Sequence, residues 1–260
     1  MSYSYAQPAF SLSGKTALIT GASSGLGRHF AHTLCRAGAR VVVTARRSDN
    51  LRELLTEIRD INPDSLAVSM DVTDSQSVEF CFGSLAAQDV VADIIINNAG
   101  LAVMKPTLSQ SERDWDSVID TNLKGAWLVA TEAARTLVDV GKPGCIVNIA
   151  SILGERVAGG IAPYAISKAG LLQATKALAL DLARYDIRVN ALLPGYILTD
   201  LNREFLTSDA GEKMRKSIPR RRFGEMSDLD GPLLLLTSDA GRALTGSCLA
   251  VDHGHLVSTL

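Results

Sequence analysis

The sequence lacks the features that define several classes of protein. Its four cysteines, Cys35, Cys81, Cys145 and Cys248, are scattered and show no C-x-x-C or other metal-ligand spacing. We therefore expect free thiols in a reducing compartment and no metal site. No apolar run is long enough to span a membrane as a helix.

The chain also lacks a strong charge imbalance and a targeting signal. Its 260 residues carry a formal net charge of −2, which argues against a surface built to bind nucleic acid or anionic lipid. Residues 1–10 contain no basic region followed by an apolar core, as a secretory signal would. We expect a flexible tail over residues 1–10, one domain over 11–260 and a cytoplasmic location.

What is present is an alternation of short apolar runs with amphipathic stretches. Strands are expected at 16–20, 41–44, 66–70, 93–96, 145–149, 188–193 and 249–251. The segments between them predict helices, among them one long helix over about 113–140 and one from Tyr164 to Leu182. Asp230 is expected to cap a late helix over 231–238, and the polar stretch 196–223 to be irregular. This alternation predicts an α/β fold: a single doubly wound Rossmann domain with a parallel sheet of roughly seven strands.

A glycine-rich turn follows the first predicted strand and opens the first predicted helix. The sequence is Thr-Gly-Ala-Ser-Ser-Gly-Leu-Gly over residues 20–27, with the spacing G-x-x-x-G-x-G. Glycines allow a tight turn and the close approach of a pyrophosphate, and the helix N-terminus offers amide donors. The simpler interpretation is a plain strand-to-helix connection, but the position at the first crossover favours a nucleotide site.

Tyr164 and Lys168 lie four residues apart, a spacing that places both side chains on one face of a helix. A tyrosine hydroxyl has a pKa of about 10, and lowering it to about 7 requires roughly 4 kcal/mol of preference for the phenolate. A cation about 4 Å away supplies on the order of 4 kcal/mol at an effective dielectric of 20. The pair is therefore either a proton-transfer site or, in the simpler interpretation, a solvated surface pair.

The glycine spacing and the Tyr-x-x-x-Lys pair together resemble the short-chain dehydrogenase/reductase family, over about residues 12–254. Further segments match the family in order, including Asp71-Val72, Asn97-Asn98-Ala99-Gly100 and Pro194-Gly195. The resemblance implies a nicotinamide cofactor held by Gly21, Ser23, Ser24, Gly25, Leu26, Gly27, Arg46, Asp71, Val72, Asn98, Ala99, Gly100, Tyr164, Lys168, Pro194, Gly195, Ile197 and Thr199.

The resemblance also implies four catalytic residues and an oxidoreductase. Tyr164 would exchange a proton with the substrate oxygen, and Lys168 would lower its pKa and bind the nicotinamide ribose. Ser151, thirteen residues before Tyr164, would donate to the same oxygen, and Asn122 would hold a water linking Lys168 to solvent. The same residues serve oxidation and reduction. A scaffold protein that had lost the chemistry is the alternative, but all four residues are present.

Within the family, the chain is most similar to gluconate 5-dehydrogenases and related sugar-acid or polyol oxidoreductases, with 3-oxoacyl thioester reductases as the runner-up. Ser151, Glu155, Tyr164 and Tyr196 are the candidate substrate contacts, although Glu155 could equally be a surface carboxylate. Against the sugar-acid assignment, arginines that follow Asn-Asn-Ala-Gly in those enzymes are replaced by Val103-Met104, with Lys105 next. That replacement favours a neutral or more apolar substrate.

The end of the second strand predicts the cofactor. NAD-specific relatives place an aspartate at the position of Ala45, where it repels a 2′-phosphate. Here Arg46 follows an apolar residue and can offer a fork of donors to phosphate, unless it is only a solvated charge, as Arg47 could also be. We expect NADP(H) to be preferred, with NAD(H) as a second cofactor.

Two further expectations concern the surface and the C-terminus. Surplus apolar residues on the predicted helices, together with the resemblance, predict a homo-oligomer and most simply a homotetramer. The family's Val-Asp-Gly-Gly is Val251-Asp252-His253-Gly254 here, so His253 occupies a place where glycine could be needed for a positive φ. His253 or His255 could also serve the substrate, whereas His29 and His32 are expected to be structural.

Overall fold

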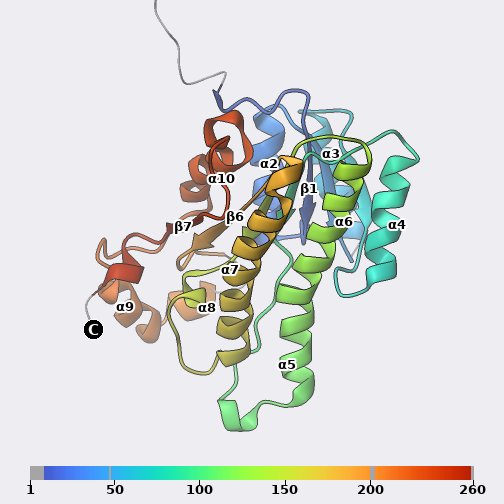
Figure 1. The fold of residues 1–260 in the computed structure, drawn as a ribbon. Helices are drawn as coiled ribbons and strands as arrows, with labels where there is room; N and C mark the ends of the chain where they lie inside the picture. The colour runs from blue at the N-terminus through green and yellow to red at the C-terminus, as the bar shows by residue number, and fades with distance from the viewer. Residues whose placement is uncertain (1–8, 47, 200–202, 259–260) are drawn as a thin grey trace, which may run out of the picture.

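The computed structural model describes residues 9–46, 48–199 and 203–258, and in this part of the chain seven strands form one parallel sheet. The strand order is β3-β2-β1-β4-β5-β6-β7, which reverses between β1 and β4, and helices cover both faces (Figure 1). The predicted doubly wound Rossmann fold with a parallel seven-stranded sheet is confirmed. Most of the expected tail, residues 1–8, lies outside the described residues.

The elements follow the predicted alternation closely. The strands are β1 (Thr16–Thr20), β2 (Arg40–Ala45), β3 (Leu66–Ser69), β4 (Ile94–Asn97), β5 (Gly144–Ile149), β6 (Ile187–Pro194) and β7 (Cys248–Val251). The helices are α2 (Gly25–Arg36), α3 (Ser48–Arg59), α4 (Ser75–Ala86), α5 (Glu112–Ile119), α6 (Ala126–Asp139), α7 (Ala162–Leu182), α8 (Arg203–Leu206), α9 (Asp209–Ser217) and α10 (Asp230–Thr237). No helix of the described residues is both long and apolar enough to cross a membrane.

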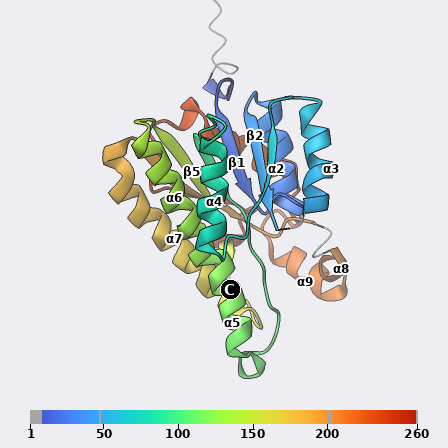
Figure 2. The same cartoon turned by 90° about the vertical axis from the view of Figure 1, so that its right-hand side faces the viewer.

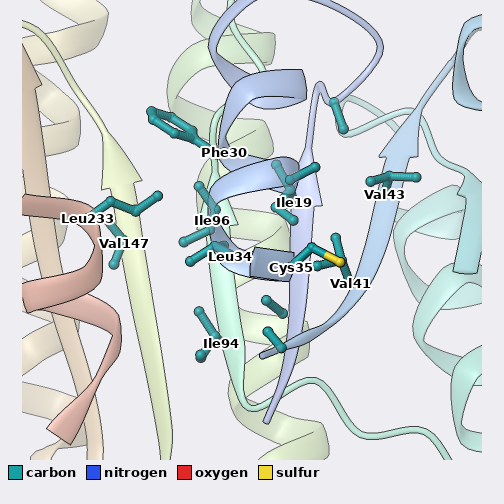
Figure 3. Close-up of a cluster of buried hydrophobic side chains, with 14 of the residues drawn as sticks. Ile19, Phe30, Leu34, Cys35, Val41, Val43, Ile94, Ile96, Val147 and Leu233 are labelled. Carbon is teal, nitrogen blue, oxygen red and sulfur yellow. The ribbon is translucent and has the colours of Figure 1, made fainter. Parts of the chain in front are cut away.

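The core has two halves because neighbouring strand residues face opposite sides of the sheet. Ala17 and Ile19 of β1 pack with Phe30 and Leu34 of α2 and with residues of α3 and α10 (Figure 3). Leu18 faces the other way, into a cluster with residues of α4, α6 and α7. Strands buried on both faces read as continuous apolar runs, which explains why the pattern predicted them well.

The predicted helix over residues 113–140 is helical along most of its length but is not α-helical throughout. A π-helical segment, Asp120–Gly125, separates α5 from α6, and a single-turn π segment inside a helix is typical of functional sites. A Cβ on Gly125 would lie 2.8 Å from Cγ2 of Val72, so glycine lets this turn approach the end of β3. Both views show α5 projecting beyond the sheet as an extension of α6 (Figures 1 and 2).

Two expectations for the last third of the chain were wrong. The stretch 196–223 is not irregular throughout but contains α8 and α9, whose polar exposed surfaces carry few apolar signals. Asp230 lies in the first turn of α10 rather than at its cap, and its carboxylate accepts hydrogen bonds from Nε2 of His29 (2.7 Å) and Oγ1 of Thr33 (2.8 Å). The Asp230 carboxylate therefore pairs with His29, about 200 residues away, instead of capping the local helix.

Candidate active site

The glycine turn between β1 and α2 has the geometry that a pyrophosphate requires. Gly21 and Gly25 have φ values of +64° and +54°, the left-handed region that favours glycine. A Cβ on Gly27 would lie 2.4 Å from the carbonyl oxygen of Gly21, so only glycine allows α2 to start so close to the turn. Ser24 caps α2 without a side-chain hydrogen bond to its first amides. Those amides suit an anionic group at the positive end of the helix.

The end of β4 fixes this turn in place. The side-chain amide of Asn98 donates from Nδ2 to the carbonyl oxygens of Thr20 (2.9 Å) and Gly21 (3.2 Å). The backbone amides of Asn98 and Ala99 both donate to Oγ1 of Thr20, at 3.0 and 2.9 Å. The predicted cofactor residues of the turn, which also include Ser23 and Leu26, therefore form one unit with Asn98 and Ala99.

The predicted adenosine side lies at the ends of β2 and β3. Ala45 is the buried last residue of β2, and Arg46 directly after it is exposed. Asp71 accepts hydrogen bonds at Oδ1 from the backbone amide and Oγ1 of Thr73, and Val72 is buried against the π-helical segment. The positively charged Arg46 and the absence of a carboxylate at residue 45 fit a 2′-phosphate. Arg47 lies outside the described residues.

The predicted nicotinamide side follows β6. The backbone amide of Gly195 donates to the carbonyl oxygen of Val251 (2.9 Å), and a Cβ on Gly195 would lie 2.8 Å from Cα of Asp252. Ile197 is buried and forms an isolated bridge with Gly224. Pro194, Gly195, Ile197 and Thr199 therefore form one short segment that runs from the carboxyl edge of the sheet. The carboxyl edge at a reversal of strand order is where such folds bind cofactors, so these residues fit a nicotinamide dinucleotide.

Ser151, Tyr164 and Lys168 come together beyond the end of β5. Ser151 is buried and caps a short 3₁₀ helix, Ile152–Gly154, its Oγ accepting a hydrogen bond from the backbone amide of Leu153 (3.1 Å). Nζ of Lys168 donates to the carbonyl oxygen of Ile149 (2.7 Å) and lies 5.6 Å from the ring centre of Tyr164. Both α7 residues therefore face the strand that delivers Ser151.

Burial shifts both titrating groups away from their usual pKa. It raises the pKa of Tyr164 above 10, and the nearby Tyr196 also raises it, while a hydrogen bond with Ser151 acts in the opposite direction. Burial lowers the pKa of Lys168 from 10.5 to about 8. Within the protein alone, Tyr164 is thus a neutral hydroxyl at pH 7 and Lys168 is mostly charged. The prediction that Lys168 lowers the pKa of Tyr164 did not include the cost of removing a phenolate from water.

Asn122 is positioned by its own hydrogen bonds in the π-helical segment. Its Nδ2 donates to the carbonyl oxygen of Leu101 (2.9 Å) and Oγ of Ser167 (3.0 Å), and its Oδ1 accepts from the amide of Leu101 (2.8 Å). Ser167 in turn donates to the carbonyl oxygen of Tyr164 (2.7 Å). A Cβ on Gly100 would lie 3.3 Å from Oδ1 of Asn122 and 3.7 Å from Nζ of Lys168. The four predicted catalytic residues and Gly100 therefore share one neighbourhood.

Sequence reasoning missed a buried row of amides beneath this site. Nδ2 of Asn97 donates to Oδ1 of Asn148 (2.9 Å) and to the carbonyl oxygen of Ala126 (3.0 Å). Nδ2 of Asn148 donates to Oγ1 of Thr175 on α7 (2.9 Å), which joins β4, β5 and α7. An asparagine inside each of two apolar strands was the available signal, because a buried amide needs partners.

A cavity of about 230 Å³ is lined by Ile152 and Leu153, the two residues that follow Ser151. Of the four predicted substrate contacts, only Tyr196 is among the described residues that line it; Ser151, Tyr164 and the exposed Glu155 are not. The cavity contains two residues that sequence reasoning did not weigh as a pair, Arg156 and His255. Its lining is Ile152, Leu153, Arg156, Val157, Ala158, Tyr196, Met214, Ser217 and His255.

The C-terminal histidines differ from one another in role. His253 has a φ of +55°, so the expectation that this position needs a positive φ is confirmed. Its Nε2 lies 3.1 Å from Oδ2 of Asp228, away from the cavity lining. His29 and His32 pair with Asp230 and Glu57, as the structural interpretation expected.

Comparisons with known proteins agree with this geometry. A family model described as enoyl-(acyl carrier protein) reductase matches residues 21–255. The chain is 37% identical to the L-rhamnose 1-dehydrogenase (NAD(P)(+)) of Azotobacter vinelandii, over 94% of this chain and 97% of the relative. It is 34% identical to a 3-oxoacyl-(acyl-carrier-protein) reductase of Staphylococcus aureus, over 92% and 97%.

A solved structure extends the comparison to three dimensions. The gluconate 5-dehydrogenase of Burkholderia cenocepacia, determined in complex with NADP and tartrate, superposes with a TM-score of 0.94 at 33% identity. The alignment covers 98% of this chain and 100% of that one. The sequence matches span the glycine turn and the Ser151, Tyr164 and Lys168 region alike. The chain therefore belongs to the short-chain dehydrogenase/reductase family of NAD(P)-dependent oxidoreductases.

Proposed function

We propose that this protein is an NADP(H)-dependent oxidoreductase that interconverts a secondary alcohol and a ketone. The observation that carries the proposal is the grouping of Ser151, Tyr164 and Lys168 at the carboxyl edge of the sheet, next to the glycine turn. A scaffold protein without chemistry would have no need for a buried lysine and a buried serine beside a half-buried tyrosine. Loss of NADPH oxidation with every ketone offered would contradict the proposal.

The roles follow from the contacts of each side chain. The nicotinamide, when bound, supplies or accepts the hydride. In the direction of reduction, Tyr164 donates its proton to the substrate oxygen, and Ser151 donates a hydrogen bond to that oxygen as negative charge develops there. The ammonium of Lys168 stabilises the phenolate left on Tyr164 and, with its neighbour Asn122, connects it to solvent. In oxidation the same groups act in reverse.

The proposed cofactor preference is NADP(H), with NAD(H) accepted less well. The exposed Arg46 beside the buried Ala45 supports it, because no carboxylate there repels a 2′-phosphate. The glycine turn, the segment Asn98 to Gly100, and Pro194 to Thr199 would hold the rest of the cofactor. The presence of NADP in the Burkholderia structure supports the same preference.

The proposed substrate is a sugar acid or polyol, as in gluconate 5-dehydrogenases; a 3-oxoacyl thioester is the alternative that the Staphylococcus relative supports. The site residues proposed for it are Ser151, Tyr164 and Tyr196, with Glu155 as the least supported because it is exposed. Steady-state rates with 5-ketogluconate and with an acetoacetyl thioester separate the two. Turnover of the thioester without any rate on the keto sugar acid would reverse our order of preference.

The proposed assembly is a homotetramer. Exposed apolar side chains on α6 and α7, where they do not face the sheet, support it: Trp127 is 47% exposed, Ile166 49% and Leu180 81%. A monomer mass in light scattering at micromolar concentration would refute the tetramer.

We also propose a single domain over residues 11–260. We propose a cytoplasmic location as well, which the four free cysteines support.

A further inference from the structure

We propose that Arg156 binds a carboxylate of the substrate in the cavity beside Ser151. The inference rests on the proposed function, because it takes the reacting carbonyl to lie at Ser151 and Tyr164. It deepens that function by naming the residue that selects an acid over an uncharged substrate. The substrate class is a ketone or secondary alcohol with a carboxylate a few carbon atoms from the reacting carbon.

The guanidinium of Arg156 is held in a fixed orientation. Its Nη1 donates hydrogen bonds to the carbonyl oxygen of His255 and to Oγ of Ser258, the latter at 2.7 Å. Asp252 fixes the segment that supplies these acceptors, because its carboxylate accepts the backbone amides of Gly254 (2.9 Å) and Leu256 (2.6 Å). Within the described part of the chain, Nε and Nη2 donate to no protein group. The Nε and Nη2 edge is a planar fork that matches the two oxygens of a carboxylate.

The rest of the cavity suits an anion. Among the described residues that line it, Arg156 is the only one with a formal charge at pH 7, since burial and the guanidinium both lower the pKa of His255 and keep its imidazole neutral. None of these described lining residues is a carboxylate, and Asp252 nearby is already bonded to two amides. Tyr196 adds a hydroxyl donor among apolar walls.

The position of the cavity ties this charge to the reacting groups. Ile152 and Leu153, which line it, directly follow Ser151, and Tyr196 lies close enough to Tyr164 to raise its pKa. A molecule with its carbonyl at Ser151 and Tyr164 would therefore extend toward Arg156. The arginines expected after Gly100 in gluconate dehydrogenases are absent here, and Arg156 supplies a cation from a different segment.

The test compares an acid with its uncharged counterpart. The kcat/KM of wild-type, Arg156→Met and Arg156→Lys enzyme is measured with 5-ketogluconate and its methyl ester, and with acetoacetate and methyl acetoacetate. Loss of a bidentate charge-assisted contact is expected to lower kcat/KM for the acids about 10- to 150-fold, mainly through KM. The esters are expected to change less than about threefold, and Arg156→Lys to fall between because a lysine keeps the charge without the fork.

A matched control separates this effect from a general loss of positive charge. Arg242→Met removes an exposed arginine beside the opposite, amino-terminal ends of β4 and β5 and is expected to leave all four rates unchanged. Equal losses for acid and ester in Arg156→Met, or no loss for either, would overturn the inference. Turnover of neutral ketones alone by the wild-type enzyme would also overturn it while leaving the oxidoreductase function standing.

A binding measurement keeps the inference testable if no turnover is found. Calorimetry measures the affinity of D-gluconate and of the uncharged D-glucitol for NADPH-loaded Tyr164→Phe enzyme, with and without Arg156→Met. Gluconate affinity is expected to fall at least tenfold and glucitol affinity to stay the same. This binding result would support the anion site even if the wild-type enzyme turned over no ketone, an absence of turnover that would itself contradict the proposed function. Absence of gluconate binding, or equal affinity in both variants, would overturn the anion site.

Discussion

The two ends of the site are built in different ways. The pyrophosphate part of the cofactor end uses two short segments, residues 20–27 and 97–100. Its geometry is set mainly by the backbone, through positive φ values and a close approach at Gly27, and is held by hydrogen bonds from the side chain of Asn98. The substrate end collects side chains from four separate segments, with Arg156, Tyr196, Ser217 and His255 as examples. Backbone amides can bind any pyrophosphate, whereas individual side chains decide which carbonyl compound enters. The cofactor end therefore indicates the class of reaction, and the substrate end determines which substrate is used.

The largest expected effect is on turnover and comes from Tyr164, which lies between the cofactor end and the substrate end. Tyr164→Phe removes the proton donor without changing the glycine turn, so turnover should fall by about 10²- to 10⁴-fold while cofactor binding survives. Steady-state kinetics give the first quantity, and fluorescence titration with NADPH gives the second. Retention of more than about a tenth of the wild-type kcat, a change below roughly 1.4 kcal/mol, would remove Tyr164 from the mechanism.

The next effect sharpens the description of the cofactor end. The wild-type enzyme is expected to prefer NADP(H) over NAD(H) about 10- to 150-fold in kcat/KM, since one charge-assisted hydrogen bond contributes roughly 1.5–3 kcal/mol. The combined change Ala45→Asp and Arg46→Ala should reverse the preference. Equal rates with both cofactors at low salt would show that Arg46 does not bind a 2′-phosphate.

A substitution in the glycine turn would break the cofactor end itself. Gly27→Ala places a Cβ 2.4 Å from the carbonyl oxygen of Gly21 and 2.5 Å from Nδ2 of Asn98, so the turn must shift. We expect a loss of about 1–3 kcal/mol in the free energy of unfolding, measured with urea, and weaker NADPH binding.

Gly83→Ala in α4 is the matched control for that substitution. Nothing lies within 4 Å of a Cβ at Gly83, and alanine is expected to stabilise the helix by up to about 1 kcal/mol. If Gly27→Ala behaved like Gly83→Ala, the close approach in the turn would not constrain the protein.

The last prediction concerns the proton on Lys168, whose effect on stability depends on pH. Its pKa is about 8 in the folded protein and 10.5 in an unfolded chain, so between these values the unfolded state binds more protons. The contribution of Lys168 to stability is therefore unfavourable below pH 8 and improves as the pH rises. The free energy of unfolding of the wild type, relative to Lys168→Met, should increase by about 2 kcal/mol from pH 7.5 to 9.5. Urea unfolding of both proteins at both pH values tests this, and a parallel pH dependence would contradict it.

The fold and the cofactor end could be predicted because their signals are local. Apolar runs such as residues 41–44 become buried strands wherever they fall, and the glycines of the turn encode its φ values directly. The positive φ of His253 was predicted in another way, from the glycine that the family carries at this position.

Contacts between distant segments decided the rest. The π-helical segment at Asn122 interrupts a sequence that is helical throughout, because Leu101 and Ser167 bind its amide and Val72 meets Gly125. Asp230 does not cap the helix as expected, because its carboxylate binds the imidazole of His29, about 200 residues away. Arg156 is held at the cavity by Nη1 hydrogen bonds to the C-terminal segment, about 100 residues away.

The sequence by itself determined the α/β alternation, the glycine turn and the four-residue spacing of Tyr164 and Lys168, since each depends on residues within one or two turns of chain. Only the tertiary structure decided the burial that sets the pKa values of those two residues, the partners of Asn122 and the lining of the substrate cavity. The physical reason is that desolvation and hydrogen-bond partners depend on which segments pack together, and that information is not contained in any short stretch of the chain.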